Sequence, residues 1–349
     1  MIDLKTFNVK DNFFGARNSH DGFKSAFGEI FSPTKYQRLF ILKGGPGTGK
    51  STILRGVISF ANSVGITASA VLCSSDVTSL DGAILEHNGK RIAVIDGTAP
   101  HVQDPQLPGA IDEILNLGDG FDLSQLEGKR TEIVGYTKEK AQEYKKAYSV
   151  LFAAKAIFNY IYNQLQFSAF YNEAEYISEE VLKEVKNSSV TPESCGGIYS
   201  AFGKDGLFSL APVGRKSIIR IKGNELLSSM ILEGIKRQAE KKGMTAFRYP
   251  SALDDRICER VCIGGTVIIS SADATDGIDI SDYIPGEYCD GFNNIYGSYT
   301  SLLHQAMVHF GNASSAHLLL EKIYRKAVDF EKNEILFTTL CQRIGDILL

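Results

Sequence analysis

A glycine-rich stretch at residues 38–54, RLFILKGGPGTGKSTIL, most constrains what this chain can fold into. Gly44, Gly49, Lys50 and Ser51 match the spacing G-x-x-x-x-G-K-[ST]. Glycines let the backbone turn tightly and point several N–H groups toward one centre, and a following helix adds the positive end of its dipole. Because such groups bind phosphate oxygens, the stretch predicts a phosphate-binding loop of the P-loop type.

The residues on either side of the loop fit this interpretation. Leu39–Leu42 is a short apolar run, as expected of a buried parallel strand. Residues 52–62 place apolar side chains on one face of a helix, and Gly65 follows near its end. Because the motif is specific only between a strand and a helix, this context strengthens the prediction.

We expect the loop to hold the phosphates of a nucleotide together with Mg²⁺. The predicted phosphate-binding residues form one continuous run: Gly44, Gly45, Pro46, Gly47, Thr48, Gly49, Lys50, Ser51 and Thr52. Lys50 should reach the β- and γ-phosphates and act in catalysis, and the Ser51 hydroxyl should hold Mg²⁺. No Asn-Lys-x-Asp guanine-reading motif occurs, so ATP is the expected nucleotide.

Three residues beyond the loop are candidates for catalysis. Asp96 ends an apolar strand, where P-loop proteins place the acid that holds Mg²⁺, although an Asp-Gly turn residue would stand there too. Gly97 follows in place of the Glu that activates water in many ATPases, which favours slow hydrolysis. His101 could orient water or bind an acceptor, or be an ordinary loop histidine. Asp76 is a candidate general base or neighbour of Mg²⁺. Asp81 has the same alternatives, but a helix cap is the better interpretation of it.

Composition narrows the class of protein. The chain of 349 residues is long enough for two domains, is 44% hydrophobic and 22% charged, and has a net charge of −4. This charge makes nucleic acid an unexpected partner, and the absence of a run of about eighteen apolar residues predicts no membrane span. The first residues lack the apolar core of a signal peptide, and the six cysteines match no zinc-site spacing. We therefore expect a reduced, cytoplasmic protein.

The first half of the chain, residues 1–190, alternates strands and helices. Strands are expected at 66–73 and 91–96, with a short helix at 79–87 between them. This alternation predicts a parallel, doubly wound sheet whose strand ends meet at the phosphate site.

Long helices follow the predicted sheet. Apolar residues step by three and four from 136 to 166, a second helix is expected at 173–186, and a linker at 187–192. The first of these helices also carries a set of lysines that we expect on a solvated face: Lys138, Lys140, Lys145 and Lys146.

The second half, residues 191–349, repeats the order of segments found in the first. FFGARNSHDGFKS from Phe13 resembles IYSAFGKDGLFS from Ile198, the glycine-rich stretch resembles KSIIRIKGNELLSSMIL from Lys216, LDGAILEH from Leu80 resembles LDDRICER from Leu253, and RIAVIDG from Arg91 resembles TVIISSA from Thr266. Long helices, expected at 313–329 and 334–349, close this half as well. The order predicts a tandem duplication and an α/β fold of two P-loop NTPase-like, three-layer domains with parallel sheets, each followed by long helices.

The second copy is degenerate. Asn224–Ser228 replaces the glycines and the lysine, and Glu225 would repel phosphate, although a helix is still expected at 224–238. We therefore expect a nucleotide site in the first half only. The second half would be a structural or regulatory element that binds a small-molecule or protein partner, or a surface that completes the first site. Four of its arginines are candidates for an arginine finger: Arg215, Arg220, Arg248 and Arg256.

The sequence around the loop resembles a known group of proteins. GGPGTGKST, then DGTAPHVQDP (residues 96–105) and PGAIDEILNLGD (residues 108–119), resembles a poorly characterised family of bacterial predicted ATPases with tandem P-loop domains. The resemblance extends over essentially the whole chain and implies ATP binding in a bacterial cytosol. In that family the second P-loop is often recognisable, and here it is absent.

Three functions follow from these features. The leading one is a Mg²⁺-dependent ATP-binding protein with slow or regulated ATPase activity. The first alternative is a small-molecule kinase in which Asp76 or His101 serves the acceptor, although residues 120–190 hold only one arginine, Arg130, for a lid. The second alternative is a non-catalytic nucleotide-sensing switch or scaffold.

Overall fold

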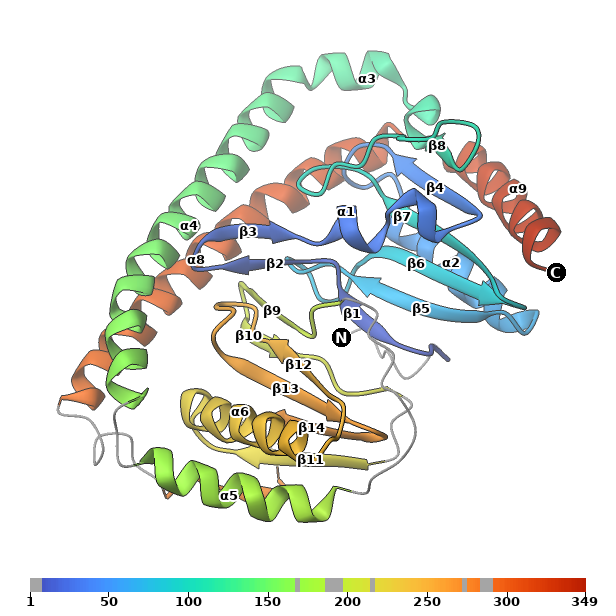
Figure 1. The fold of residues 1–349 in the computed structure, drawn as a ribbon. Helices are drawn as coiled ribbons and strands as arrows, with labels where there is room; N and C mark the ends of the chain where they lie inside the picture. Colours follow the sequence, from blue (N-terminus) through green and yellow to red (C-terminus); the bar gives the residue numbers. More distant parts are fainter. Residues whose placement is uncertain (1–7, 167–169, 186–196, 214–216, 272–274, 283–290) are drawn as a thin grey trace.

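The described residues form two large sheets that lie one above the other, with long helices running along both (Figure 1). The computed structural model describes residues 8–166, 170–185, 197–213, 217–271, 275–282 and 291–349. The predicted linker at 187–192 and Arg215 fall outside these ranges.

The first sheet is mixed, not parallel as the sequence predicted. Its six described strands are, in spatial order, β1 (Asn12–Phe14), β5 (Thr67–Leu72), β6 (Leu80–His87), β7 (Lys90–Asp96), β4 (Arg38–Lys43) and β8 (Asp112–Asn116). β6 pairs antiparallel with both neighbours, and the other pairings are parallel. β6 occupies the segment predicted as a helix at 79–87. That prediction was wrong because Leu80–Leu85 is buried throughout, and a short, wholly buried apolar run has no period that separates strand from helix.

The second sheet has the same order of strands and the same directions. Its five described strands are β12 (Ala246–Pro250), β13 (Cys258–Ile263), β14 (Thr266–Ser270), β11 (Ser217–Lys222) and β15 (Ile278–Asp279). They stand in the places of β5, β6, β7, β4 and β8, with β13 as the antiparallel strand. One sequence match is displaced: Leu80 begins β6, whereas Leu253 precedes β13, and Cys258 takes the place of Leu80.

Two matching hairpins lie between the sheets. β2 (Ala16–Ser19) pairs with β3 (Gly22–Ser25), and β9 (Ser200–Gly203) pairs with β10 (Gly206–Ser209), each through a two-residue turn. The residues that precede the two hairpins pair with each other, because Phe14 N–H donates to the Ile198 carbonyl at 2.7 Å and Ile198 N–H donates to the Phe14 carbonyl at 3.1 Å.

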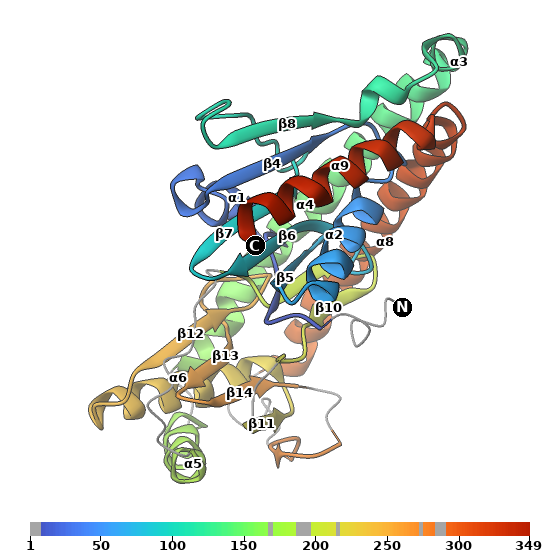
Figure 2. The same cartoon turned by 90° about the vertical axis from the view of Figure 1, so that its right-hand side faces the viewer.

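The helices cross between the halves. α2 (Lys50–Ser63) and α9 (Phe330–Leu348) share one apolar core on the first sheet, whereas α5 (Phe170–Glu184) and α6 (Glu225–Lys241) share another on the second (Figure 2). The last helix of each half thus covers the sheet of the other half. α4 (Arg130–Gln166) and α8 (Phe292–Lys326) run antiparallel and join the two ends of the molecule, as the ring contacts Tyr144–Phe310 and Phe158–Tyr299 indicate. Short helices complete the fold: α1 (Phe27–Ile30), η2 (Pro33–Lys35), η3 (Leu117–Gly120) and α3 (Leu123–Gly128).

Burial on both faces explains the continuous apolar run of β4. Phe40 and Leu42 pack into the core under α2 and α9, whereas Leu39 and Ile41 pack into a core shared with α1 and the second sheet. The strand therefore needs apolar residues at successive positions. Among the described helices, none combines the length and the hydropathy that crossing a membrane requires.

Candidate functional site

The glycine-rich loop joins β4 to α2, as the sequence predicted. Gly47 has φ +72° and Gly49 has φ +92°, which are left-handed values that L side chains rarely adopt. Lys50 begins α2 and turns back over the loop, where its Nζ donates to the carbonyls of Gly44 at 3.1 Å and Gly45 at 2.9 Å. The N-terminus of α2 and an ammonium group therefore meet at one point, which is an arrangement that suits an anion.

Asp96 faces this lysine from the neighbouring strand. β7 runs parallel to β4 with Asp96 opposite Leu42, so both strands end at the same edge of the sheet. One carboxylate oxygen of Asp96, Oδ2, lies 3.7 Å from Lys50 Nζ. The other, Oδ1, accepts from Thr98 N–H at 2.9 Å and from its hydroxyl at 2.6 Å. The carboxylate is thus oriented by the turn while it faces the loop.

Gly97 leaves no room for the side chain that many ATPases carry after this Asp. A Cβ built at Gly97 would lie 2.3 Å from Ile41 Cγ2 and 3.1 Å from the Gln103 carbonyl oxygen. A glutamate at this position would therefore force β4 and the following loop apart.

Ser51 connects the loop to the antiparallel strand. Its hydroxyl accepts from the Leu80 N–H at 3.0 Å, at the start of β6. The next residue, Asp81, is therefore held at the same edge of the sheet. The predicted helix cap at Asp81 was wrong, because this residue belongs to a strand.

Asp81 pairs with His101, the third predicted catalytic residue. Asp81 Oδ2 lies 3.1 Å from His101 Nε2, and the imidazole stacks on Phe27 with ring centroids 4.1 Å apart. Burial lowers the pKa of His101, but the hydrogen bond to Asp81 and the charges of Asp81 and Asp96 outweigh it and leave the pKa above its usual value. The structure therefore offers a buried Asp–His pair close to the loop.

Asp76 is exposed and forms a local turn. Its Oδ1 accepts from the Thr78 N–H at 3.0 Å and from the Thr78 hydroxyl at 2.6 Å. These bonds do not join Asp76 to Lys50, Asp96 or His101. Asp76 therefore stabilises a local turn in this structure.

Helices of the second half pack against the loop. The sequence offered such a surface as one alternative and named none of the residues that form it. A Cβ built at Gly47 would lie 2.7 Å from the Glu321 carbonyl oxygen of α8, and one at Gly45 would lie 3.0 Å from the Tyr324 ring. Asn333 of α9 donates to the Thr48 carbonyl at 2.9 Å. These contacts support the loop from outside. They join residues more than 270 positions apart in the sequence, for which local sequence patterns carry no signal.

The oxygen atoms at the site fit Mg²⁺ held largely by a bound phosphate and water. The described residues include no group of three or more His, Cys, Asp or Glu side chains arranged for a metal. Mg²⁺ commonly takes one or two protein oxygens beside phosphate and water oxygens, and the Ser51 hydroxyl and the Asp96 carboxylate are ligands of that kind.

The second half lacks such a loop. Asn224 caps α6 by accepting from the Leu226 N–H at 2.9 Å, so the chain passes directly from β11 to the helix. Burial, followed by the charge of Glu259, raises the pKa of Glu225 to about 7. A carboxyl with this pKa is only partly charged near neutral pH, so the repulsion of phosphate expected at Glu225 stays a prediction.

The three described arginine-finger candidates bind acids within the second half. Arg220 contacts Asp276 at 3.1 Å, Arg248 contacts Glu233, and Arg256 contacts Asp254 at 2.8 Å and Asn159 at 2.7 Å. All three arginine side chains therefore form their contacts away from the glycine-rich loop.

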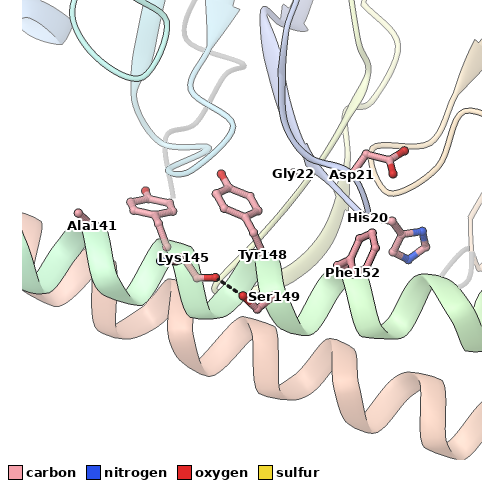
Figure 3. Close-up of a pocket in the computed structure, with 9 residues that line it drawn as sticks. His20, Asp21, Gly22, Ala141, Lys145, Tyr148, Ser149 and Phe152 are labelled. Atoms are coloured by element: carbon pink, nitrogen blue, oxygen red, sulfur yellow. Dashed lines mark hydrogen bonds between the residues drawn. The ribbon is translucent and has the colours of Figure 1, made fainter.

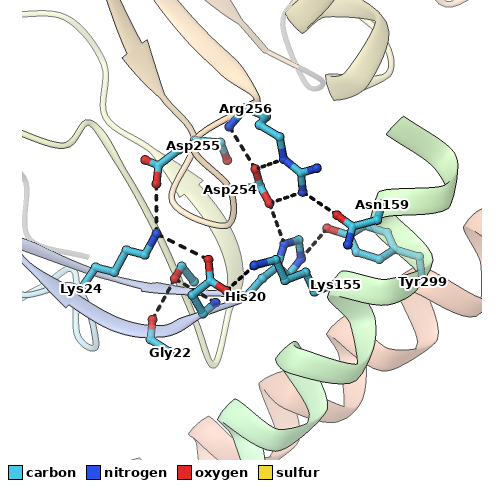
Figure 4. A network of polar contacts seen from close by, with 12 residues as sticks. His20, Gly22, Lys24, Lys155, Asn159, Asp254, Asp255, Arg256 and Tyr299 are labelled. Carbon is cyan, nitrogen blue, oxygen red and sulfur yellow. Dashed lines mark hydrogen bonds and ion pairs between the residues drawn. The ribbon is translucent and has the colours of Figure 1, made fainter. Parts of the chain in front are cut away.

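Arg256 belongs to a polar cluster that joins both halves (Figure 4). His20, in the turn of the β2–β3 hairpin, contacts Asp254 at 3.4 Å and the Tyr299 hydroxyl at 3.2 Å. Lys24 contacts Asp255 at 3.0 Å. These bonds fix the hairpin between the second sheet and α8.

An open hollow of about 600 Å³ lies between the same hairpin turn and α4. Its lining includes His20, Asp21 and Tyr148, which Figure 3 shows on the two sides. None of the glycine-rich loop lines it. The chemistry of the side chains, not this hollow, therefore defines the candidate site.

Comparisons of the chain with protein-family models, curated proteins and solved structures found no match.

Proposed function

We propose that the protein binds ATP with Mg²⁺ at the glycine-rich loop and hydrolyses it slowly. The observation that carries this proposal is the meeting of Lys50, Ser51 and Asp96 at one edge of the sheet, with Lys50 Nζ 3.7 Å from Asp96 Oδ2. An ammonium group, a helix N-terminus, a hydroxyl and a carboxylate at one place suit a phosphate and its Mg²⁺.

Each residue has a distinct part in this proposal. The loop amides and Lys50 bind the phosphate oxygens, so Lys50 must leave the carbonyls of Gly44 and Gly45 when the nucleotide enters. Ser51 and Asp96 hold the Mg²⁺. When bound, the metal neutralises charge on the phosphates.

The Asp81–His101 pair is the proposed route for proton transfer. Because Nε2 of His101 faces Asp81, the proton of the attacking water would go to Nδ1, which is buried and forms no hydrogen bond to the described residues, and the Asp81 carboxylate would stabilise the imidazolium that results. Gly97 supplies no carboxylate, and the raised pKa of the buried histidine favours its protonated form, which cannot accept a proton. Both features support slow turnover.

We also propose that the chain arose by tandem duplication and that only the first copy kept the site. The two sheets share strand order and directions, and the hairpins share their registers. A further correspondence is the bond from Ser51: the Ser229 hydroxyl of α6 accepts from the Cys258 N–H at 2.8 Å, as Ser51 accepts from Leu80. Under this proposal the degenerate half serves the first site through α8 and α9.

Isothermal titration of the protein with ATP, with and without Mg²⁺, followed by a phosphate-release assay, tests the proposal. We expect Mg²⁺-dependent binding and slow, steady phosphate release. ADP formation only after a small-molecule acceptor is added would support the kinase instead. Tight binding without turnover would support the nucleotide-sensing switch. Failure to bind ATP under either condition would contradict all three.

A further inference from the structure

Lys140 differs from the other lysines on α4. Lys138, Lys145 and Lys146 are exposed, as the sequence predicted for the whole set, but Lys140 is half-buried against α8. Among the described residues, Lys140 Nζ has one side-chain hydrogen-bond contact, to Nδ1 of His317 at 3.5 Å. Among the described residues, no carboxylate forms an ion pair with this ammonium group. The prediction of a solvated face was therefore wrong at Lys140.

Contacts along α8 bring Lys140 to the glycine-rich loop. His317 Nε2 lies 3.5 Å from Glu321 Oε1, and the carbonyl of Glu321 lies against Gly47. Burial lowers the pKa of Lys140, and the positive charge of Lys50 lowers it further against the opposing charge of Glu321. The contacts from Lys140 to His317, from His317 to Glu321 and from Glu321 to Gly47 thus bring the Lys140 ammonium group toward the loop that carries Lys50.

Lys50 has the Asp96 carboxylate beside it, whereas Lys140 forms no ion pair among the described residues. An ammonium group without an ion pair is unfavourable in a partly buried place, and a phosphate that contacts it forms charge-assisted hydrogen bonds. The N-terminus of α2 favours negative charge at the same place. These observations point to a ligand with an exposed anionic group at Lys140.

We propose that Lys140 binds the terminal phosphate of ATP, opposite Lys50, and so distinguishes ATP from ADP. This inference depends on the proposed nucleotide site. Tyr144, one turn further along α4, lies close enough to Asp81 for that charge to raise its pKa, after the larger effect of burial. Under this proposal, the face of α4 that carries Lys140 and Tyr144 is turned toward Asp81, and the last phosphate lies between that face and Lys50.

The consequence is a link between the γ-phosphate and the long helices. α4 packs along α8, and α8 braces the loop from outside. A phosphate held by Lys50 and Lys140 ties α4 to the loop in the ATP state and releases it after the phosphate leaves.

The test compares Mg·ATP and Mg·ADP affinities of full-length Lys140→Met with those of the wild type by isothermal titration. Loss of one charge-assisted contact should weaken ATP binding by at least about tenfold, and ADP affinity should stay within about twofold. Lys138→Met, an exposed lysine on the same helix, should change neither. Lys140→Arg, which keeps the charge, should retain most of the ATP preference.

The ratio of the two dissociation constants is the decisive quantity, because it does not depend on the fraction of each preparation that is folded. An unchanged ratio in Lys140→Met would overturn the role of Lys140 and leave the proposed nucleotide site standing. A wild-type protein that binds neither nucleotide would instead contradict the proposed function itself.

Discussion

Replacing Gly47 by alanine should destabilise the protein through two separable effects. The residue has φ +72°, and a left-handed backbone costs an L side chain about 1–2 kcal/mol. The new Cβ would also lie 2.7 Å from the Glu321 carbonyl oxygen and 3.2 Å from its Cα. These are backbone atoms, so no side-chain rotation relieves the clash and α8 must move. Overpacking of this kind costs about 1–3 kcal/mol, which gives a total of roughly 2–5 kcal/mol.

Gly109→Ala separates the two effects. Gly109 has φ +76°, but a Cβ there meets nothing within 4 Å. This variant should therefore lose only the conformational part, about 1–2 kcal/mol. The difference between the two variants measures the contact between α8 and the glycine-rich loop.

Urea denaturation of both variants, followed by circular dichroism and by tyrosine fluorescence, gives the free energies of unfolding. The structure predicts that Gly47→Ala is less stable than Gly109→Ala by about 1–3 kcal/mol. Equal losses would refute the packing of α8 on the loop and, with it, the bracing of the site by the second half.

Three more outcomes follow from the structure. The hydrogen bond and charge of Asp81 outweigh burial and raise the pKa of His101, so the rate of phosphate release should fall as the pH drops, with the fall beginning above about pH 6.5. Asp81→Asn should move this fall in rate to lower pH, and a fall at the same pH would exclude His101 as the base. Ile344→Ala on α9 removes a fully buried side chain and should cost about 2–5 kcal/mol in urea titrations, whereas Ile335→Ala, 68% exposed on the same helix, should cost less than about 0.5 kcal/mol. Burial raises the pKa of Asp254, but its arginine and histidine partners outweigh that effect and hold it well below the usual value, so the carboxylate contributes stability above about pH 4 that is lost as the pH falls further. The stability gap between wild type and Asp254→Asn should therefore narrow below about pH 4, and a constant gap would contradict the assignment.

Local sequence patterns correctly predicted the helices whose apolar residues recur with the helical period. The apolar face of 52–62 became α2, and the spacing of three and four after 136 became α4, which begins slightly earlier, at Arg130. The segment 79–87 failed because both faces of β6 are covered, so no alternation marked it as a strand. That one strand turned the expected parallel sheet into a mixed one.

The residues of the candidate site also fall into those that local sequence patterns predicted and those that they did not. Lys50, Ser51 and Asp96 lie together because a strand–loop–helix motif and a neighbouring strand place them by local rules. Asp81 was a candidate, but its pairing with His101 was not predicted, because it depends on the hairpin β5–β6. Lys140 was expected on a solvated face, because its burial depends on packing between α4 and α8. The bracing of Gly47 by Glu321 joins residues from opposite halves, and no spacing in the sequence announces it.

Binding of Mg·ATP to the Lys50→Ala variant tests the central claim most directly. Lys204→Ala, in an exposed hairpin turn of the second half, is the matched control and should bind as the wild type does. Isothermal titration should give a dissociation constant for Lys50→Ala at least about tenfold weaker than that of the wild type, because a charge-assisted contact to phosphate is lost. Wild-type affinity in Lys50→Ala would contradict the placement of the nucleotide at the glycine-rich loop.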